Sequence, residues 1–209
     1  MPYKLIFTVA RMNPPTPGHF ELIKKMFEEA IRHGVKKIYI ILSSKTDELK
    51  NPLEPEEKKY LLETYGIPWV RRQLIDLTDG ISVDIIMTHE HNYFQPNDIW
   101  GSIRFVLNKN ENGKALFIAG EDSTIPFDKS VDIILLDRKK NPISGTLVRA
   151  IGYLSLPALE SIYQPFGISQ KEVYIIYSSI RRLDPPDDNI LSMARNMLRE
   201  RYCLRLRKN

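Results

Sequence analysis

The chain has 209 residues, of which 43% are hydrophobic and 27% charged, a balance typical of one packed domain with room for an extension. Its longest apolar runs are strand-sized, well short of the ~20 residues that a membrane-spanning helix needs, so membrane insertion is excluded. The net charge of +4 is small, and the single cysteine, Cys203, cannot form an internal disulfide. Because the N-terminus also lacks a signal-peptide pattern, we expect a cytoplasmic protein.

The first forty residues predict a strand, a rigid loop, a helix and a second strand. Residues 3–10 are apolar, β-branched or aromatic and predict a buried strand. Residues 11–18 contain three prolines and a glycine, which exclude a helix. From His19, apolar side chains recur at helical spacing until Gly34 gives a stop signal, and residues 36–43 predict the next strand. This order has the dimensions of a βαβ unit.

The alternation continues as far as residue 154. The predicted elements are a loop at 46–55, a helix at 56–65 ended by Gly66, a strand at 82–88, a helix at 97–107, and strands at 115–119 and 131–136. Strands that alternate with helices favour a parallel sheet covered on both faces. We therefore predict a Rossmann-like doubly wound α/β fold of about five parallel strands.

A helical C-terminal extension is expected after this sheet. Residues 157–163 and 189–201 predict helices, with Asp188 as the cap of the second, whereas residues 171–178 fit either a strand or a helix. We divide the chain into a domain of residues 1–154 and an extension of residues 155–209 packed on it. Arginines crowd the last fifteen positions, but no aromatic side chains alternate with them, which disfavours nucleic-acid binding.

The loop after the first strand is a candidate anion site. In a doubly wound sheet, ligands bind beyond the carboxyl ends of the strands, near the point where strand order reverses. Gly18 allows a phosphate to approach the backbone, and the free N–H groups of the following helix favour an anion. Thr16 adds a hydroxyl and His19 an imidazole at the same place. The alternative interpretation is a tight turn in which His19 caps the helix.

A second candidate anion site follows the strand at 131–136. Ser144 is suited to cap a helix that runs through Arg149, and Thr146 lies in its first turn. The planar guanidinium of Arg149 suits phosphate oxygens. The alternative for Arg149 alone is a surface salt bridge.

Both segments resemble signatures of the nucleotidyltransferase superfamily. Thr16-Pro17-Gly18-His19 resembles its (H/T)xGH motif, and the longer run 11–19 resembles the GRFNPPTxGH form of that motif. It departs from that form at Ala10, where the form has glycine, and at Met12, where it has phenylalanine. The segment 143–149 resembles the second motif, ISxTxxR, with Gly145 at the variable third position. The resemblance covers roughly residues 3–152 and does not extend to the last fifty.

The resemblance implies an enzyme that joins the α-phosphate of a nucleoside triphosphate to a phosphorylated acceptor and releases pyrophosphate, with Mg²⁺ as cofactor. It assigns catalysis to His19, Thr16 and Arg149, and nucleotide binding to Arg11, Asn13, Gly18, Gly120, Asp122, Ser144 and Thr146. Acceptor binding would fall to Lys45, Lys50, Trp69 and Trp100. Turn formation for Gly120 and Asp122, solvation for the lysines and packing for the tryptophans remain alternatives.

The expected substrates are ATP and nicotinamide mononucleotide, giving NAD. Alternatives are CTP as donor, a phosphorylated alcohol or phosphopantetheine as acceptor, and a regulator that binds a nucleotide without turnover. Family members are often oligomers, so a homo-oligomer is an option. His89-Glu90-His91 does not predict a metal site, because three adjacent side chains on a strand end cannot all face one ion.

Overall fold

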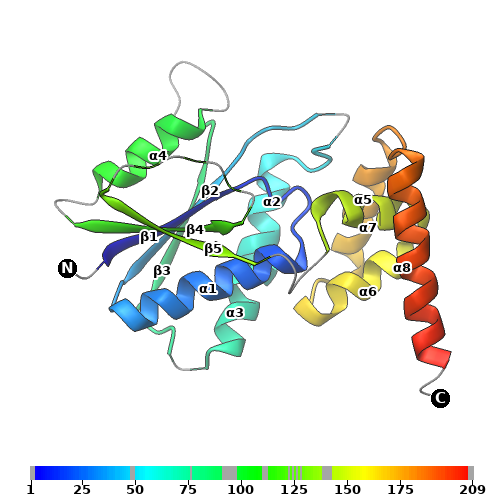
Figure 1. The fold of residues 1–209 in the computed structure, drawn as a ribbon, viewed down its shortest axis with the longest axis horizontal. Helices are drawn as coiled ribbons and strands as arrows, with labels where there is room; N and C mark the ends of the chain where they lie inside the picture. Colours follow the sequence, from blue (N-terminus) through cyan, green and yellow to red (C-terminus); the bar gives the residue numbers. More distant parts are fainter. Residues whose placement is uncertain are drawn as a thin grey trace.

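The computed structural model describes residues 3–47, 50–75, 77–90, 98–109, 113–121, 123, 125, 127, 129–137 and 143–206. It confirms the expected Rossmann-like doubly wound α/β fold, with a five-stranded parallel sheet in the order β3-β2-β1-β4-β5 (Figure 1). The strands are β1 (Tyr3–Ala10), β2 (Lys37–Leu42), β3 (Ser82–Met87), β4 (Lys114–Gly120) and β5 (Val131–Leu136). The helices are α1 (Pro17–His33), α2 (Pro55–Leu61), η1 (Leu62–Gly66), α3 (Ile67–Gln73), α4 (Ile99–Asn108), α5 (Gly145–Leu154), α6 (Leu156–Tyr163), η3 (Gln164–Phe166), α7 (Gln170–Arg181) and α8 (Asp188–Leu206).

The order of the strands reverses at β1. The chain moves outward from β1 to β2 and β3, then returns to place β4 on the other side of β1 and β5 beyond it. Phe7 of β1 is therefore in register with Tyr39 of β2 and with Phe117 of β4. The loop that follows β1 starts at the crevice where ligands bind in folds of this type.

Successive side chains of the strands enter two different cores. On one face, Ile6, Ile38 and Leu116 pack with residues of α1 and α3, whereas on the other face Phe7 and Phe117 pack under α4. This alternation follows from the two-residue period of a strand. In Figure 1, α1 and α3 accordingly lie below the sheet and α4 above it.

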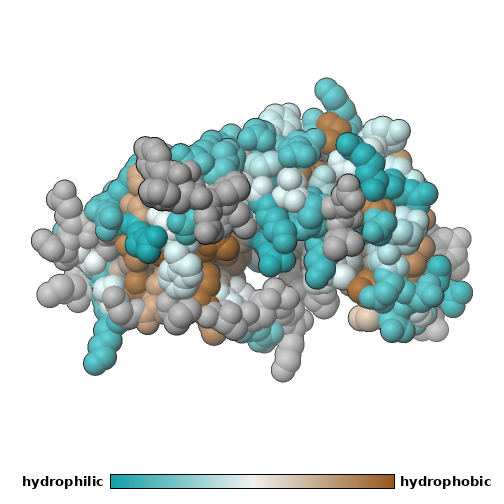
Figure 2. Space-filling model, turned by 90° about the horizontal axis from the view of Figure 1, so that it is seen from above, coloured by the Kyte–Doolittle hydropathy of each residue, from teal (hydrophilic) through white to brown (hydrophobic). Residues whose placement is uncertain are grey.

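Part of the face under α4 is open to solvent. Trp100 on α4 is 46% exposed, and Ile133 and Leu135 on the edge strand β5 are 46% and 50% exposed. Figure 2 shows apolar atoms at the surface on the side of the sheet, away from the C-terminal helices. No helix within the described residues is both long enough and apolar enough to cross a membrane.

The C-terminal helices pack on one another and on the sheet domain. Helices α5 to α8 stand together at one end of the molecule (Figure 1), and α5 packs against α6, α7 and α8. Residues 171–178, which fitted either a strand or a helix, lie within the helix α7. Tyr163, Phe166 and Val173 belong to the same apolar core as Phe20 of α1. The expected domain boundary at residue 154 stays a prediction. Helix α5 lies on the N-terminal side of this boundary but packs against the helices of the extension.

The cap of α8 differs from the expectation. We expected Asp188 to cap this helix, but the carboxylate of Asp187 accepts the N–H of Ile190 at 3.0 Å, and its carbonyl accepts the N–H of Leu191. Asp187 therefore caps the helix and Asp188 is its first residue. The expectation was wrong by one position because two adjacent aspartates offer equivalent caps in sequence.

The expectation for Gly66 was also wrong. The helix of residues 56–65 does not end there but continues through the π-helical turn η1 into α3. Gly66 has right-handed helical angles (φ −65°, ψ −56°), so it is not acting as a left-handed stop. A Cβ atom at Gly66 would lie 2.9 Å from Cε1 of Phe20, whose ring stacks on Phe166 at 4.4 Å. The absence of a side chain at Gly66 therefore allows Phe20 of α1 to pack closely against this helix.

We predict that Gly66→Ala lowers the free energy of unfolding by about 1–3 kcal/mol, because the methyl group overpacks the Phe20 ring. We expect this loss of stability although alanine is more favourable than glycine in a helix by about 1 kcal/mol. Urea denaturation measures the change. Gly145→Ala is the control, since its Cβ would have its nearest neighbour at 3.6 Å. Equal stability of the two variants would contradict the packing role of Gly66.

Candidate functional site

A cleft of about 1340 Å³ opens at the carboxyl ends of the strands, where the strand order reverses. It exceeds the ~300–1000 Å³ of a typical small-molecule pocket, which leaves room for two ligands side by side. The loop after β1, the starts of α1 and α5, and the ends of β4 and β5 form its walls. It brings together ten of the residues expected in the site, Arg11, Asn13, Thr16, Gly18, His19, Lys50, Gly120, Ser144, Thr146 and Arg149.

Three other expected residues, all described, are not among those that line the cleft. Lys45 is exposed and pairs with Asp47 at 3.6 Å. Trp69 packs against the rings of Phe20 and Phe166, which is a core position. Trp100 is a partly exposed residue of α4, whereas its neighbour Ile99 does line the cleft. Asp122 lies outside the described residues, as does His91.

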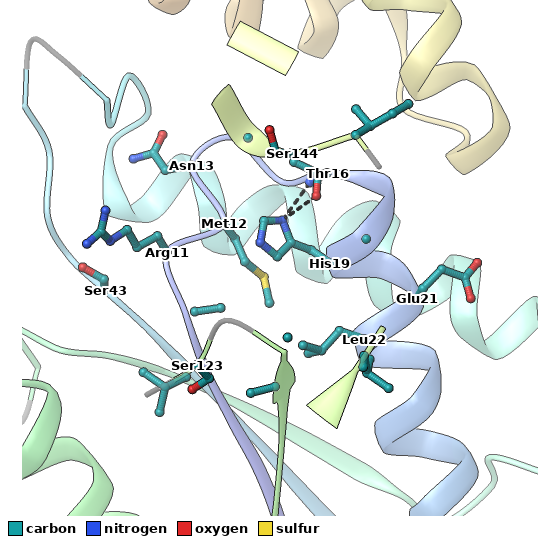
Figure 3. A pocket seen from close by; sticks show the side chains of 18 of the residues that line it. Arg11, Met12, Asn13, Thr16, His19, Glu21, Leu22, Ser43, Ser123 and Ser144 are labelled. Carbon is teal, nitrogen blue, oxygen red and sulfur yellow. Dashed lines mark hydrogen bonds between the residues drawn. The ribbon is translucent and has the colours of Figure 1, made fainter. Parts of the chain in front are cut away.

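His19 lies at the centre of the cleft, and its ring is held by the residue that begins the helix (Figure 3). Nδ1 of His19 accepts the backbone N–H of Thr16 at 2.9 Å and lies 3.0 Å from the Thr16 hydroxyl oxygen. A nitrogen that accepts from a backbone N–H carries no proton, so the neutral ring is protonated on Nε2. Thr16 is therefore the N-cap of α1, His19 at the third helical position completes a capping box with it, and the same bond fixes the tautomer of His19.

The loop between β1 and α1 is held by side chains from distant segments. The amide of Asn13 donates to the carbonyl of Leu53 at 2.9 Å and accepts its N–H at 2.8 Å. The hydroxyl of Tyr163 donates to the carbonyl of Pro15 at 2.7 Å. Met12 has a positive φ of 46° with a fully buried side chain, and the Asn13–Pro14 peptide bond is cis. A non-glycine residue in that region is uncommon and marks a tightly determined backbone.

The start of α5 has the expected geometry. The hydroxyl of Ser144 accepts the N–H of Leu147 at 3.2 Å, which confirms the predicted cap. The guanidinium of Arg149 donates to the carbonyl of Asn13 at 3.3 Å and to the Thr146 hydroxyl at 3.1 Å. The two segments that carried the sequence argument, 136 residues apart, are thus in direct contact.

Positive charge is concentrated around this contact. Burial lowers the pKa of the Arg149 guanidinium; the carboxylate of Asp47 opposes that shift, and the nearby cation Arg11 adds to it. An arginine stays protonated at any pH at which a protein is folded. Arg11, which follows β1, and Arg149, in the second turn of α5, are thus two cations whose mutual repulsion an anion in the cleft would relieve.

The two sides of the cleft differ in chemistry. Leu22, Ile134 and Leu136 form an apolar strip between α1 and β5, although α1 also lines the cleft with the charged residues Glu21, Lys24, Lys25 and Glu28. Arg11, Ser43 and Lys50, which follow β1 and β2, line a polar side. In Figure 3, Arg11 and Ser43 lie on one side of His19, and Leu22 lies on the other. The apolar strip suits a flat ring, and the polar side suits a charged group.

No model of a known protein family matches the chain, and a search of the curated proteins finds no significant match. The functional argument therefore rests on the residues and on the geometry of the cleft.

The donor set around the cleft fits a magnesium ion carried by its substrate. Within the described residues, no group of three or more His, Cys, Asp or Glu side chains comes together. Mg²⁺ commonly keeps several waters and binds through substrate phosphates in place of a protein cage. The residues present are compatible with that arrangement.

One important residue near the cleft was not anticipated in the site. Lys58 of α2 is fully buried, and its ammonium donates to the carbonyl of Ser43 at 2.6 Å. The N–H of Ser43 in turn donates to the carbonyl of Ala10, where the loop begins. Burial lowers the pKa of Lys58 to about 8, against partial opposition from Glu54 and Glu56. A lysine in a polar segment gives no sequence signal for such burial, because lysine is almost always exposed.

The pKa of Lys58 is about 8 in the folded protein and 10.5 ordinarily. We predict that Lys58 makes the protein more stable as the pH rises between these two values. In that range the unfolded chain binds a proton that the folded chain has released, so raising the pH favours the fold, by up to about 1.4 kcal/mol per pH unit. Urea denaturation of the wild type and of Lys58→Met at several pH values isolates this contribution. Parallel stability curves for the two proteins would rule it out.

Proposed function

We propose that this protein is a nucleotidyltransferase, which transfers a nucleoside monophosphate from a triphosphate to a phosphorylated acceptor and releases pyrophosphate. The observation that carries the proposal is the contact between Arg149 at the start of α5 and Asn13 in the loop that precedes α1. It places two helix N-termini, a histidine and two arginines around one cleft. A triphosphate is an anion of the size and charge that such an arrangement favours.

The proposed reaction needs no covalent intermediate on the protein. An oxygen of the acceptor phosphate attacks the α-phosphorus in line, and the bond from that phosphorus to the bridging oxygen breaks. Pyrophosphate leaves with the bonding electrons. Catalysis then consists of positioning and of stabilising the charge that develops.

The roles of the residues follow from their places in the cleft. His19, protonated on Nε2, donates to the α-phosphate as its charge rises, and Thr16 steadies the neighbouring phosphates. Ser144 and Thr146 at the start of α5 hold the β- and γ-phosphates, and Arg149 neutralises the leaving group. Bound Mg²⁺ would screen the charge of the phosphate oxygens.

The apolar strip and the polar side suggest how the two substrates divide the cleft. The base of the triphosphate would lie against Leu22, Ile134 and Leu136, and the acceptor phosphate near Arg11 and Lys50. Our first choice of substrates is ATP with nicotinamide mononucleotide, in a cytoplasmic enzyme. This choice follows the sequence resemblance, and CTP or another acceptor remains an outcome of the test.

The test measures pyrophosphate release with Mg²⁺, offering ATP or CTP with a panel of phosphorylated acceptors led by nicotinamide mononucleotide. We expect release with one pair, and a loss of about a hundredfold or more in Arg149→Ala. Arg32→Ala is the matched control, because Arg32 is an exposed arginine in the last turn of α1. Binding of ATP with no release from any pair would instead favour a regulator that only binds the nucleotide.

We predict that His19→Gln separates the two roles of His19. Glutamine at the third position of a helix can still accept the N–H of the capping residue, so stability should stay within about 0.5 kcal/mol of the wild type. Pyrophosphate release should fall about a hundredfold, because the amide cannot replace the imidazole at the α-phosphate. His19→Ala should lose both activity and stability. Full turnover in His19→Gln would show that the imidazole only caps the helix.

A further inference from the structure

The peptide group between Pro15 and Thr16 is hydrogen-bonded at both ends. Its carbonyl oxygen, on Pro15, accepts the hydroxyl of Tyr163 at 2.7 Å. Its N–H, on Thr16, donates to Nδ1 of His19 at 2.9 Å. A continuous chain of hydrogen bonds therefore runs from α6, in the C-terminal extension, through one peptide group to the imidazole in the cleft.

We propose that Tyr163 is a positioning residue, which holds His19 in the tautomer protonated on Nε2 by acting through the Pro15–Thr16 peptide group. Its catalytic consequence rests on the proposed transferase function, but its effect on the His19 ring does not. The extension thereby becomes part of the machinery of the site.

The direction of each hydrogen bond in this chain is fixed by the chemistry of its atoms. A carbonyl oxygen can only accept, so the Tyr163 hydroxyl must donate to Pro15. A backbone N–H can only donate, so Nδ1 of His19 must be the acceptor and hold no proton. A ring protonated on Nδ1 would bring two N–H groups face to face. The neutral imidazole is therefore protonated on Nε2.

The hydroxyl remains a donor at every pH at which the protein is folded. Tyr163 is fully buried, and this burial raises the pKa of its phenol far above the ordinary range. A donor on the carbonyl side of an amide also polarises that amide, which strengthens its N–H as a donor. Tyr163 thus both orients the peptide plane and reinforces the bond to His19.

The start of α1 anchors this peptide group on its Thr16 side, because the carbonyl of Thr16 accepts two N–H groups of that helix. On the Pro15 side the loop supplies less support. Asn13 is fastened to Leu53, and Arg149 binds the carbonyl of Asn13, but both contacts lie on the N-terminal side of Pro14. Of the hydrogen bonds described above, the one from the Tyr163 hydroxyl is the one that holds the carbonyl of Pro15. Loss of the hydroxyl leaves that carbonyl buried without its donor, and the peptide plane is then free to tilt.

The experiment records ¹⁵N chemical shifts of the histidine rings by NMR at neutral pH, in the wild type, Tyr163→Phe and the control Ile162→Val. The comparison with His19→Gln identifies the His19 signals. In the wild type, we expect an unprotonated Nδ1 and a protonated Nε2 for His19. In Tyr163→Phe, the His19 signals should shift towards the tautomer average or broaden, while the other histidines keep theirs.

Ile162→Val is a suitable control because Ile162 is a neighbour of Tyr163 on α6 but packs in the separate cluster formed by α5, α6 and α8. Its His19 signals should match those of the wild type. Unchanged His19 signals in Tyr163→Phe would overturn the proposal. A wild-type His19 protonated on Nδ1 would overturn it as well, and that measurement does not require Tyr163→Phe to fold.

The catalytic part is tested by kinetics well below the unfolding temperature. In Tyr163→Phe, kcat should fall about tenfold to a hundredfold, while KM for the nucleotide changes little, because the misplaced imidazole acts mainly in the transition state. Ile162→Val should keep the wild-type kcat. An equal kcat in Tyr163→Phe and the control would overturn the catalytic role. Absence of turnover in the wild type would instead count against the transferase function, since the NMR result stands without turnover.

Discussion

The site depends on how the buried polar groups of the loop between β1 and α1 are satisfied. This loop has neither a helical nor a strand pattern of hydrogen bonds, yet Asn13 and Thr16 are almost fully buried. Buried backbone groups must find partners, because leaving one unpaired costs about 1–3 kcal/mol. The partners come from elsewhere in the chain, namely Ser43 after β2, Leu53 before α2, Arg149 on α5 and Tyr163 on α6.

This dependence links the geometry of the cleft to the completed fold. The conformation of the loop depends on the segments after β2 and before α2 and on the C-terminal helices, because each supplies a hydrogen bond to it. Arg149 has two uses in this scheme, since it supports the carbonyl of Asn13 and faces the cleft as a cation. Because a guanidinium has five N–H groups, Arg149 can donate to an anion in the cleft while it keeps its bond to Asn13.

The sequence predicted the elements and the location of the cleft because these follow from local patterns. Pro14 and Pro15 exclude a helix, the apolar periodicity predicts β1 and α1, and Ser144 has the chemistry of a cap. The expectation of a loop through residue 18 was wrong by two positions, because α1 begins at Pro17 and a proline is tolerated at the first position of a helix. Gly66 misled the prediction, because a glycine chosen for the close approach of Phe20 looks the same in sequence as one that ends a helix. Lys58 and Tyr163 were beyond prediction for a different reason: their roles depend on partners 15 and 148 residues away that no local pattern identifies. The packing of Trp69 had been weighed as the alternative to acceptor binding, and the structure shows it.

Helices α6 to α8 therefore have a clear physical role although no sequence motif was found in them. Helix α5 carries Ser144, Thr146 and Arg149 at its start, and its body packs against α6, α7 and α8. Helix α6 follows directly and carries Tyr163 into the core shared with Phe20. A displacement of this helical group would move Arg149 and the support of Pro15 together, so the starts of α1 and α5 both depend on the same packing. The position of the cleft is set by the sheet, and the alignment of its polar groups is set by the extension.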